Sequence, residues 1–374
     1  MITGRQLTST ISDDGLLRLS VQDQSFEPPA SGEVVIRMEG APINPTDLGL
    51  LLGPAEVTSV RVSGTATRPV LTFDVPEGRL AGVAGRLGRA LPVGIEGAGT
   101  VVAAGAGAER LRGRRVAMFG GGSFADYYKA AASEVVPLPD SVGAAEGAAI
   151  FVNPMTALGF VETARREGHM AIVHTAAASN VGQILQRICL RDGIPLVNIV
   201  RSKEQEKLLR GIGARHVLNS QDEDFRGRLL EAVAETEATV AFDAIGGGKL
   251  GSDILTAMER AAIRRMPVFS RYGSDTAKQL YVYGRLDHSA ITLNRAGFGM
   301  MWGVSGWLLM PFLARAGRET EERMRQRVIA ELGTTFASRY TRTIGLAEML
   351  DPEMLLAYER KTTGQKYLVD PTRG

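Results

Sequence analysis

The sequence predicts a mixed α/β fold with two domains, one mostly antiparallel and one built on a parallel sheet. The chain has 374 residues, 44% of them hydrophobic, and chains of this length divide more often into two domains than one. In the first part, short strand-like segments follow one another between glycines, as in a barrel-like antiparallel domain. From residue 141 onward, helical stretches alternate with short apolar strands, which is the rhythm of βαβ units and a parallel sheet.

The first domain is expected to contain half-buried strands and one short helix. Residues 33–39 alternate apolar and charged side chains, which predicts a strand. Further strands are predicted at 99–104, 115–118 and 134–138. Residues 41–48 contain two prolines and N-cap residues, so we expect a turn into a short helix. Residues 54–89 show one strand candidate, at 69–75, and are interpreted as an irregular insertion.

The second domain is expected to supply the parallel strands. They are predicted at 170–175, 195–200, 216–218, 239–243, 265–269 and 279–283. The very hydrophobic residues 298–314 contain three glycines and a proline, and we interpret them as a buried or dimer-interface helix rather than a membrane span. A last strand at 366–369 is expected to return to the first domain. The first domain is predicted to comprise residues 1–150 and 340–374, and the second domain residues 151–339.

Charge and cysteine content narrow the functional class. The 43 basic and 41 acidic residues give a net charge of +2, without the long basic stretch of a nucleic-acid surface, so no nucleic-acid partner is expected. The single cysteine, Cys189, excludes an internal disulfide, and its apolar neighbours predict a buried thiol. Residues 1–17 lack the pattern of a secretory signal, so a cytoplasmic location without membrane attachment is expected.

A turn of small residues follows the apolar strand 171–173 and leads into a helix. Its central residues are Ala178, Ser179, Asn180 and Val181. A pyrophosphate has to approach the backbone and the first helical N–H groups closely, which side chains of this size permit. The usual G-x-G-x-x-G pattern is absent, so an ordinary strand-to-helix turn is the alternative interpretation.

The next strand ends in a basic sequence, Arg201-Ser202-Lys203. It lies about 25 residues beyond the turn, where NAD-binding enzymes place an acidic residue on the ribose hydroxyl groups. Two basic side chains with a hydroxyl between them suit a 2′-phosphate instead. The sequence therefore predicts a Rossmann domain that binds NADPH rather than NADH, with a solvated strand end as the alternative.

Six motifs in order resemble the zinc-free branch of the medium-chain dehydrogenase/reductase superfamily, especially its quinone oxidoreductases and 2-enoyl thioester reductases. They are Ala41–Leu48, Gly94–Gly99, Phe151–Ala157, the small-residue turn with Val181-Gly182, Phe242–Gly247 and Tyr283-Gly284. The resemblance covers nearly the whole chain. It implies a GroES-like catalytic domain, a Rossmann domain for NADP and a homodimer.

The zinc ligands of the metal-dependent relatives are missing from this sequence. Residues 44–47 carry no thiolate, Ile95 stands where a histidine ligand would be, and one cysteine cannot build a four-cysteine lobe. The four histidines have no spacing that pairs two of them as ligands, so no metal is expected. What remains is hydride transfer from NADPH to a small hydrophobic electrophile, either a quinone or an activated C=C bond.

The resemblance also assigns cofactor contacts. It implies that Asn153 and the pair Tyr283-Gly284 lie at the nicotinamide side, Ala178 to Val181 at the phosphates, Arg201, Ser202 and Lys203 at the adenosine phosphate, and Lys366 near the cofactor. Two alternatives stay open. Asn153 can cap the helix that begins before Pro154, and Tyr283 can be a core aromatic residue at a strand end.

The proton donor is not identified by the sequence. Enoyl thioester reductases have a tyrosine shortly after the first motif, but this chain has Gly53-Pro54-Ala55 there and no tyrosine before Tyr127. Asn44 and Asp47 are the catalytic candidates, although each can simply shape its own turn. The missing tyrosine keeps a second hypothesis open, an NADPH-binding regulatory or structural protein with little catalysis. A third, an NAD-dependent metal-free dehydrogenase, requires Arg201 and Lys203 to be irrelevant.

Overall fold

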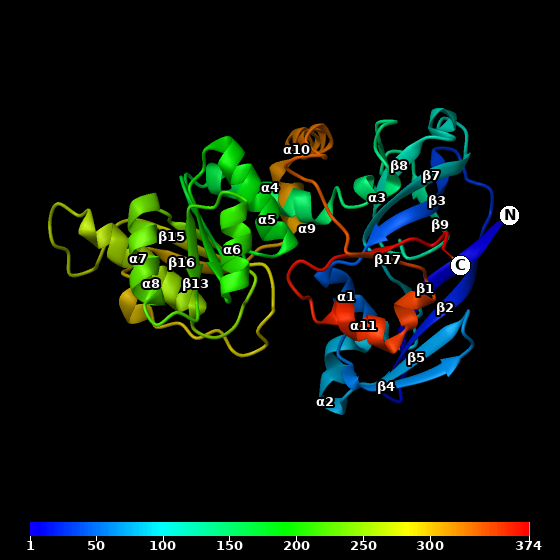
Figure 1. The fold of residues 1–374 in the computed structure, drawn as a ribbon, viewed down its shortest axis with the longest axis horizontal. Coiled ribbons are helices and arrows are strands. Elements are labelled where there is room, and N and C mark those ends of the chain that lie inside the picture. The colour runs from blue at the N-terminus through cyan, green and yellow to red at the C-terminus, as the bar shows by residue number, and fades with distance from the viewer. Residues whose placement is uncertain (374) are drawn as a thin grey trace. The chain divides into compact units, whose positions relative to one another are not determined.

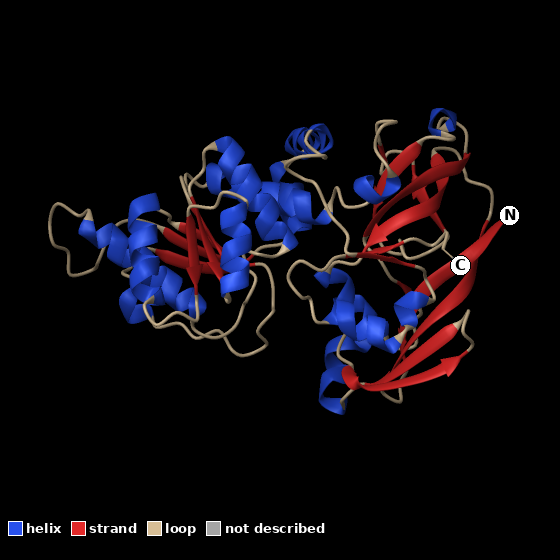
Figure 2. Cartoon of the chain, in the orientation of Figure 1, coloured by secondary structure: helices blue, strands red, loops and turns tan. Residues whose placement is uncertain are grey.

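The computed structural model describes residues 1–373, which divide into two compact units. Unit 1 comprises Met1–Val152 and the residues from Glu331 onward, and unit 2 comprises Asn153–Ala330 (Figure 1). Unit 1 is built on two largely antiparallel sheets, whereas unit 2 is one parallel sheet with helices around it (Figure 2). The predicted fold class is therefore confirmed.

Unit 1 consists mainly of strands joined by short connections. Its strands are β1 (Ile2–Ile11), β2 (Leu16–Phe26), β3 (Glu33–Pro42), β4 (Glu56–Gly64), β5 (Pro69–Asp74), β6 (Leu91–Pro92), β7 (Glu96–Ala104), β8 (Arg115–Phe119), β9 (Tyr127–Ala131), β10 (Val136–Pro137), β17 (Arg342–Ile344) and β18 (Tyr367–Val369). Its helices are α1 (Pro45–Leu51), α2 (Glu77–Leu80), α3 (Ala144–Gly147) and α11 (Pro352–Glu359), with 3-10 turns η1 (Ala81–Arg86), η2 (Glu109–Leu111) and η4 (Glu348–Leu350).

The two sheets of unit 1 bring the ends of the chain together. One sheet has the order β4-β5-β2-β1-β6, and the other has the order β10-β8-β7-β3-β18-β17 with β9 also paired to β3. The described pairings are antiparallel except that of β17 with β18. Leu368 and Val369 of β18 pair with the end of β3, so the predicted return of the last strand to the first domain is confirmed.

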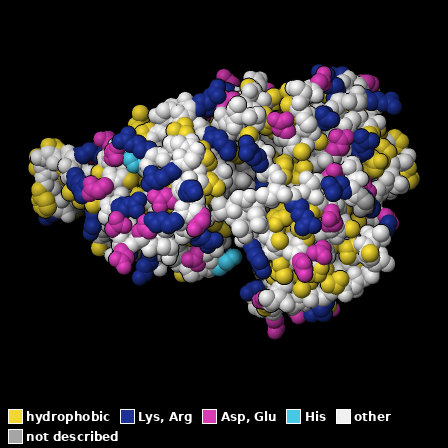
Figure 3. All heavy atoms as spheres, in the orientation of Figure 1, with side chains coloured by type: hydrophobic (Ala, Val, Ile, Leu, Met, Phe, Trp, Pro, Cys, Tyr) yellow, Lys and Arg dark blue, Asp and Glu magenta, His cyan; other side chains and the backbone are white. Residues whose placement is uncertain are grey.

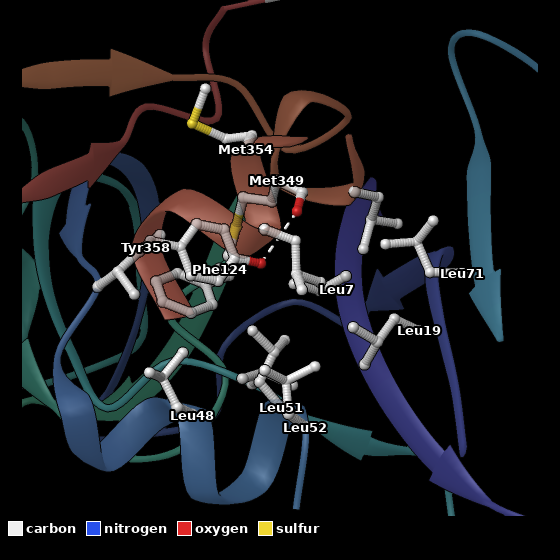
Figure 4. Packing of buried hydrophobic residues seen from close by; sticks show 14 of the residues in the cluster. Leu7, Leu19, Leu48, Leu51, Leu52, Leu71, Phe124, Met349, Met354 and Tyr358 are labelled. Atoms are coloured by element: carbon white, nitrogen blue, oxygen red, sulfur yellow. Dashed lines mark hydrogen bonds between the residues drawn. The ribbon is translucent and has the colours of Figure 1, made fainter. Parts of the chain in front are cut away.

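A hydrophobic core in unit 1 joins the first sheet to helices α1 and α11. Leu7 of β1, Leu51 of α1 and Phe124 are fully buried in it. Figure 4 shows Tyr358 of α11 reaching into the same core, where its hydroxyl donates a hydrogen bond to the carbonyl of Met349 at 3.0 Å. The C-terminal segment is therefore part of the core of unit 1.

The interpretation of residues 54–89 as an irregular insertion is wrong. Strands β4 and β5 form a hairpin, and β5 pairs with β2 in the register Leu17↔Phe73 and Leu19↔Leu71. Strand β4 lies at the edge of the sheet and is mostly exposed, so its side chains are polar and show little apolar alternation. The prediction of a strand at 134–138 was also too long, because only β10 pairs there.

Unit 2 has the architecture of a doubly wound α/β domain. Its strands are β11 (Ile172–His174), β12 (Leu196–Val200), β13 (His216–Asn219), β14 (Val240–Asp243), β15 (Lys278–Val282) and β16 (Trp302–Gly306). Its helices are α4 (Val152–Arg166), α5 (Asn180–Asp192), α6 (Lys203–Gly211), α7 (Phe225–Thr236), α8 (Leu250–Arg264), α9 (Leu309–Ala316) and α10 (Arg318–Ala330), with the 3-10 turn η3 (Arg295–Gly297).

The parallel sheet has the order β13-β12-β11-β14-β15-β16, which is the strand order of a Rossmann domain. Helices cover both faces. Val197 and Ile199 of β12 pack with α7 and α8, whereas the next residue, Val200, packs with Leu209 of α6 and with Val217 of β13. Because successive strand residues point to opposite faces, α6 lies on the other face from α7 and α8, as Figure 1 also shows.

Two elements predicted for unit 2 are wrong. Residues 265–269 form no strand, because they belong to an exposed loop in which Phe269 is 90% exposed. Hydrophobic side chains gather at this end of unit 2 (Figure 3). Residues 298–314 are not one helix, because β16 forms the edge strand of the sheet and α9 begins only at Leu309.

Two predictions about buried apolar segments can also be assessed. Cys189 is 1% exposed, so the predicted buried thiol is confirmed. One helical run, Ala144–Arg166, has the length and composition of a membrane span, but 78% of its most apolar stretch is buried inside the protein. A core helix satisfies the same criterion.

A buried ion pair anchors the loop that precedes β15. Lys278 Nζ of β15 lies 2.5 Å from Glu259 Oε2 of α8, and both residues are at most 2% exposed. Ser274 donates to the same carboxylate from its backbone N–H at 2.8 Å and from its hydroxyl at 2.6 Å. Burial alone would raise the pKa of Glu259, but these partners lower it on balance.

Glu259→Gln is expected to destabilise the protein by about 3–5 kcal/mol, because the charge of Lys278 would remain buried without its counterion. The matched control is Glu231→Gln, which breaks the exposed pair with Arg264 at 2.8 Å and is expected to cost no more than about 1 kcal/mol. Urea denaturation measures both. Equal small losses would contradict the structural role of the buried pair.

Candidate functional site

The carboxyl ends of β11 and β14 form the topological switch point of the parallel sheet. Strand β11 is flanked by β12, the next strand along the chain, and by β14, which the chain reaches only after β13. In open α/β sheets, ligands bind outside the carboxyl ends of the strands at such a point. The loops after β11, β12, β14 and β15 are therefore the candidate cofactor site.

Close backbone contacts shape the turn after β11. Ala176 has a φ of 47°, in the left-handed region, and Ala177 N–H donates to Ile199 of β12 at 3.1 Å. Ser179 caps helix α5 by accepting from Gly182 N–H at 3.2 Å. A Cβ atom on Gly182 would lie 2.1 Å from the Ala177 carbonyl, so this position requires glycine, as does the third position of the usual fingerprint.

The residues predicted to line the phosphates lie at the start of helix α5. Ala178 is buried, whereas Ser179, Asn180 and Val181 are partly exposed. The N-terminus of a helix carries partial positive charge and unpaired N–H groups, and both favour an anion. The local geometry therefore suits a pyrophosphate group.

A hydroxyl and a carboxylate join the loops on the two sides of the switch point. Thr175 Oγ1 donates to Asp243 Oδ1 at 2.6 Å and accepts from Ala244 N–H at 2.8 Å. Asp243 also accepts from the N–H groups of Ile245 at 2.9 Å and Gly246 at 3.1 Å. Thr175 and Asp243 were not predicted as site residues. The signal in the sequence was an aspartate at a strand end shortly before two glycines, Gly246 and Gly247.

Tyr283, at the end of β15, belongs to an aromatic cluster. Its ring centroid lies 4.7 Å from that of Phe160 and is stacked 5.8 Å from that of His174. Its hydroxyl is 2.8 Å from His174 Nε2, and burial lowers the pKa of His174 to about 3, so the imidazole is neutral. Tyr283 is half-buried in this cluster, whereas Gly284 brings the β14 and β15 loops together, since its Cβ would lie 2.5 Å from the Ala244 carbonyl.

The basic residues after β12 differ in their surroundings. Arg201 is exposed, and its guanidinium forms no ion pair with any residue of the described chain. Ser202 caps α6 by accepting from Gln205 N–H at 3.3 Å. Lys203 Nζ is paired with Asp222 at 3.0 Å and Glu206 at 3.3 Å, and both carboxylates raise its pKa. Arg201 is therefore available to bind a phosphate, whereas the positive charge of Lys203 is already balanced by the two carboxylates.

A buried polar cluster surrounds Glu96 in unit 1. The Glu96 side chain is fully buried and accepts hydrogen bonds from Asn44 Nδ2 at 2.9 Å, Phe151 N–H at 3.0 Å and Val152 N–H at 2.9 Å. Burial raises the pKa of Glu96, and the charge of Lys366 opposes that rise. Glu96 thus connects the turn before α1, strand β7 and the first residue of α4.

The C-terminal segment adds a cation and a phenol to this cluster. Lys366 is 3% exposed; its Nζ donates to Ser338 Oγ at 3.1 Å and lies 5.1 Å from the centroid of the Tyr340 ring. Burial lowers the pKa of Lys366 to about 8, against the charge of Glu96. Glu96, Ser338 and Tyr340 were not predicted as site residues, and only Glu96, which lies in the motif Gly94–Gly99, carried a signal in the sequence.

The catalytic candidates Asn44 and Asp47 meet in the same cluster. Both are 1% exposed, and Asn44 N–H donates to Asp47 Oδ2 at 2.7 Å. Burial raises the pKa of Asp47 to about 8, and the charge of Glu96 raises it further, while the amides of Asn44 and Ile95 lower it. At neutral pH, Asp47 therefore holds a proton.

Comparison with known proteins places this geometry in a family. Residues 30–140 match the profile of the alcohol dehydrogenase GroES-like domain. The structure is similar to that of a Mesorhizobium loti protein described as a "putative NADPH:quinone reductase", with 25% sequence identity and a TM-score of 0.73. The similarity covers 99% of this chain and 98% of that protein. The chain belongs to the medium-chain dehydrogenase/reductase superfamily. The resemblance inferred from the six motifs is confirmed.

Two further proteins illustrate the range of similarity. A quinone oxidoreductase from Pseudomonas aeruginosa is 30% identical over 158 residues, which are 41% of this chain and 49% of that protein. The match thus spans about half of that relative. A complex of Etr1p with NADP and crotonyl-CoA has the same fold, with a TM-score of 0.71, 17% identity, and coverage of 99% of this chain and all of that one.

Asn153, the remaining residue predicted to contact the cofactor, lies in α4. Asn153 is 4% exposed in the first turn of that helix, directly before Pro154. In residues 1–373, no group of three or more His, Cys, Asp or Glu side chains is arranged to hold a metal ion.

The raised pKa of Asp47 predicts a pH-dependent stability difference. The native state binds this proton more tightly than the unfolded chain, so its contribution to stability is complete below pH 3.8 and is lost as the pH rises through about 8. The variant Asp47→Asn has no titrating group at this position, so it does not lose stability in this way as the pH rises. Relative to the wild type, it is expected to gain roughly 3–5 kcal/mol between pH 5 and pH 9, about 1.4 kcal/mol for each pH unit up to about 8.

Urea denaturation at several pH values measures this difference. The control is Asp140→Asn, whose side chain is 91% exposed and whose stability difference from the wild type is expected to stay constant. A constant difference for Asp47→Asn as well would show that Asp47 is ionised across this range.

Proposed function

We propose that this protein is a zinc-independent, NADPH-dependent oxidoreductase that reduces a quinone or an activated C=C bond by hydride transfer. The observation that carries this proposal is the Rossmann switch point with the unpaired guanidinium of Arg201 beyond β12. A quinone oxidoreductase among the relatives and a fold neighbour solved with NADP and crotonyl-CoA, an enoyl thioester, support both acceptor classes.

The residues of unit 2 fit the proposed cofactor. The N-terminus of α5, with its small side chains from Ala178 to Val181, would hold the pyrophosphate. Arg201 and the nearby Ser202 would hold the 2′-phosphate, with Lys203 a weaker contributor because of its ion pairs. Asn153 and the loop at Gly284 would face the nicotinamide end. Bound NADPH would supply the hydride, and the chain would position it.

The proposal extends to assembly and location. Strand β16 is the edge of the described parallel sheet, and the residues flanking it are apolar and exposed: Met300 at 69%, Met301 at 49% and Leu308 at 64%. An uncovered edge of this kind favours pairing with a second copy, so we include a homodimer in the proposal. The lone buried thiol of Cys189 fits a reducing, cytoplasmic compartment.

The first experiment measures oxidation of NADPH and NADH by the purified protein with quinones, enones and enoyl thioesters, in the presence of EDTA. The proposal expects turnover that prefers NADPH and is insensitive to EDTA. Tight NADPH binding without turnover on any acceptor would instead favour a cofactor-binding regulatory or structural protein.

The surroundings of the two basic residues predict unequal effects on cofactor binding. Arg201→Ala is expected to raise the KM for NADPH about 10- to 100-fold, the size of one or two charged hydrogen bonds, and to leave the KM for NADH unchanged. Lys203→Ala is expected to change either KM by less than about threefold, because its ammonium is already paired. Steady-state kinetics with both cofactors measure these effects.

The matched control is Arg210→Ala, since Arg210 is another arginine of α6 and pairs with Glu206 at 2.9 Å. It is expected to leave both KM values unchanged. Equal effects of Arg201→Ala on NADPH and NADH would refute the 2′-phosphate role, and a larger effect of Lys203→Ala than of Arg201→Ala would refute the division of roles.

A further inference from the structure

A cleft of about 450 Å³ lies between α7, α8 and the segment that follows β15, all of them in unit 2. Helices α7 and α8 pack side by side on one face of the parallel sheet (Figure 1). The volume is that of a site for a small molecule. None of the residues predicted to hold the cofactor lines this cleft, so it is separate from the candidate cofactor site.

Backbone hydrogen bonds fix the segment after β15 to the start of α8. Gly248 N–H donates to the Ala290 carbonyl at 3.1 Å, and Thr292 N–H donates to the Gly248 carbonyl at 2.8 Å. Asn294 N–H donates to the Ser252 hydroxyl oxygen at 3.0 Å. The walls of the cleft are thus ordered by the chain itself, so a ligand that binds there does not have to order them.

Two unpaired cations, Lys249 and Arg260, stand at opposite ends of the α8 side of the cleft. They are 11 positions apart, which is three helical turns and about 16 Å along the axis, so both face the same way. Both side chains are exposed, and neither forms a hydrogen bond or an ion pair with any residue from 1 to 373. They are therefore available to a ligand that carries negative charge at both ends.

The rest of the lining is polar, and its charges are balanced. Among the described residues that line the cleft, Asp253 alone carries a carboxylate, and Arg226 of α7 donates to it from Nε at 2.9 Å. Ser252 and Thr256 contribute hydroxyl groups, and Asn294 contributes an amide. Groups of this kind match the hydroxyl groups of a sugar.

The same lining disfavours other classes of ligand. Within residues 1–373, no aromatic side chain lines the cleft, so a nucleotide base has no ring on which to stack. No histidine or cysteine of the described chain lines it either. Because its one carboxylate is already paired, the cleft is suited to binding rather than to catalysis.

We propose that this cleft binds a small sugar phosphate with a phosphate group at each end, one held by Lys249 and the other by Arg260. Both side chains are flexible, which lets them close on a ligand shorter than their spacing. The sugar hydroxyl groups lie between the two cations, against Ser252 and Thr256. The site goes beyond the proposed function, since it lies in a different part of unit 2 and requires no turnover of NADPH.

Isothermal titration calorimetry with fructose 1,6-bisphosphate as the probe tests this site in the full chain. The wild type is expected to bind the probe. Lys249→Ala and Arg260→Ala are each expected to raise its Kd about 10-fold, the size of one hydrogen bond between charged groups. Fructose 6-phosphate, which has a single phosphate, is expected to bind about 10-fold more weakly and to respond to only one of the two substitutions.

The matched control is Arg264→Ala, since Arg264 lies on the same helix, pairs with Glu231 at 2.8 Å and does not line the cleft. It is expected to leave the Kd unchanged, as is Arg201→Ala at the cofactor loops. All four substituted side chains are exposed, so unchanged urea midpoints are expected.

Three results overturn the inference. They are a wild type that does not bind the bisphosphate, an equal loss of affinity in Arg264→Ala and Arg260→Ala, and a loss of binding in Arg201→Ala, which assigns the ligand to the cofactor loops. Each of them leaves the proposed function intact, because the turnover of NADPH is measured separately.

Discussion

The buried carboxylate of Glu96 is the interaction on which the candidate site in unit 1 depends. A carboxylate removed from water is very unfavourable unless it is hydrogen-bonded and paired with a cation. Asn44, Phe151 and Val152 donate three hydrogen bonds to it, and Lys366 supplies the opposing charge. These partners come from segments far apart in the chain, so satisfying one charge holds all of them in place.

Unit 2 builds its site by a different physical means. Its loops meet through backbone contacts that leave no room for a Cβ atom at Gly182 or Gly284, and one hydroxyl–carboxylate bond, between Thr175 and Asp243, joins the two sides of the switch point. Close backbone approach suits a ligand bound by N–H groups and helix ends. In unit 1, by contrast, a buried carboxyl group and a buried lysine shift each other's pKa. Unit 2 thus offers backbone groups to a ligand, whereas the cluster in unit 1 is built from buried titratable side chains.

The sequence predicted most of the parallel sheet because its strands are buried on both faces and appear as continuous apolar runs. It failed where burial and composition disagree. Phe269 and its apolar neighbours resemble a strand, but Phe269 is exposed in a loop. The apolar stretch 298–314 resembles one helix, but its first part is an edge strand. Strand β4, polar and at a sheet edge, gave almost no signal.

The site was predictable only where its residues lie in local motifs. Asn44 and Asp47 were found because they share one turn, and Arg201 because it follows a strand at a recognisable distance. Tyr340 and Ser338 belong to no motif, and they reach Lys366 only because the C-terminal segment folds back through β17 and β18. Such contacts are tertiary, and no local pattern encodes them.

The charges of the cluster also explain why a proton can be stored there. The three N–H donors to Glu96 favour its ionised form against the burial that raises its pKa, whereas burial, and then the charge of Glu96, raise the pKa of Asp47 to about 8. Lys366 balances Glu96. Loss of a proton from Lys366 would remove the charge that opposes the rise in the pKa of Glu96, so the protonation states of the two groups are coupled.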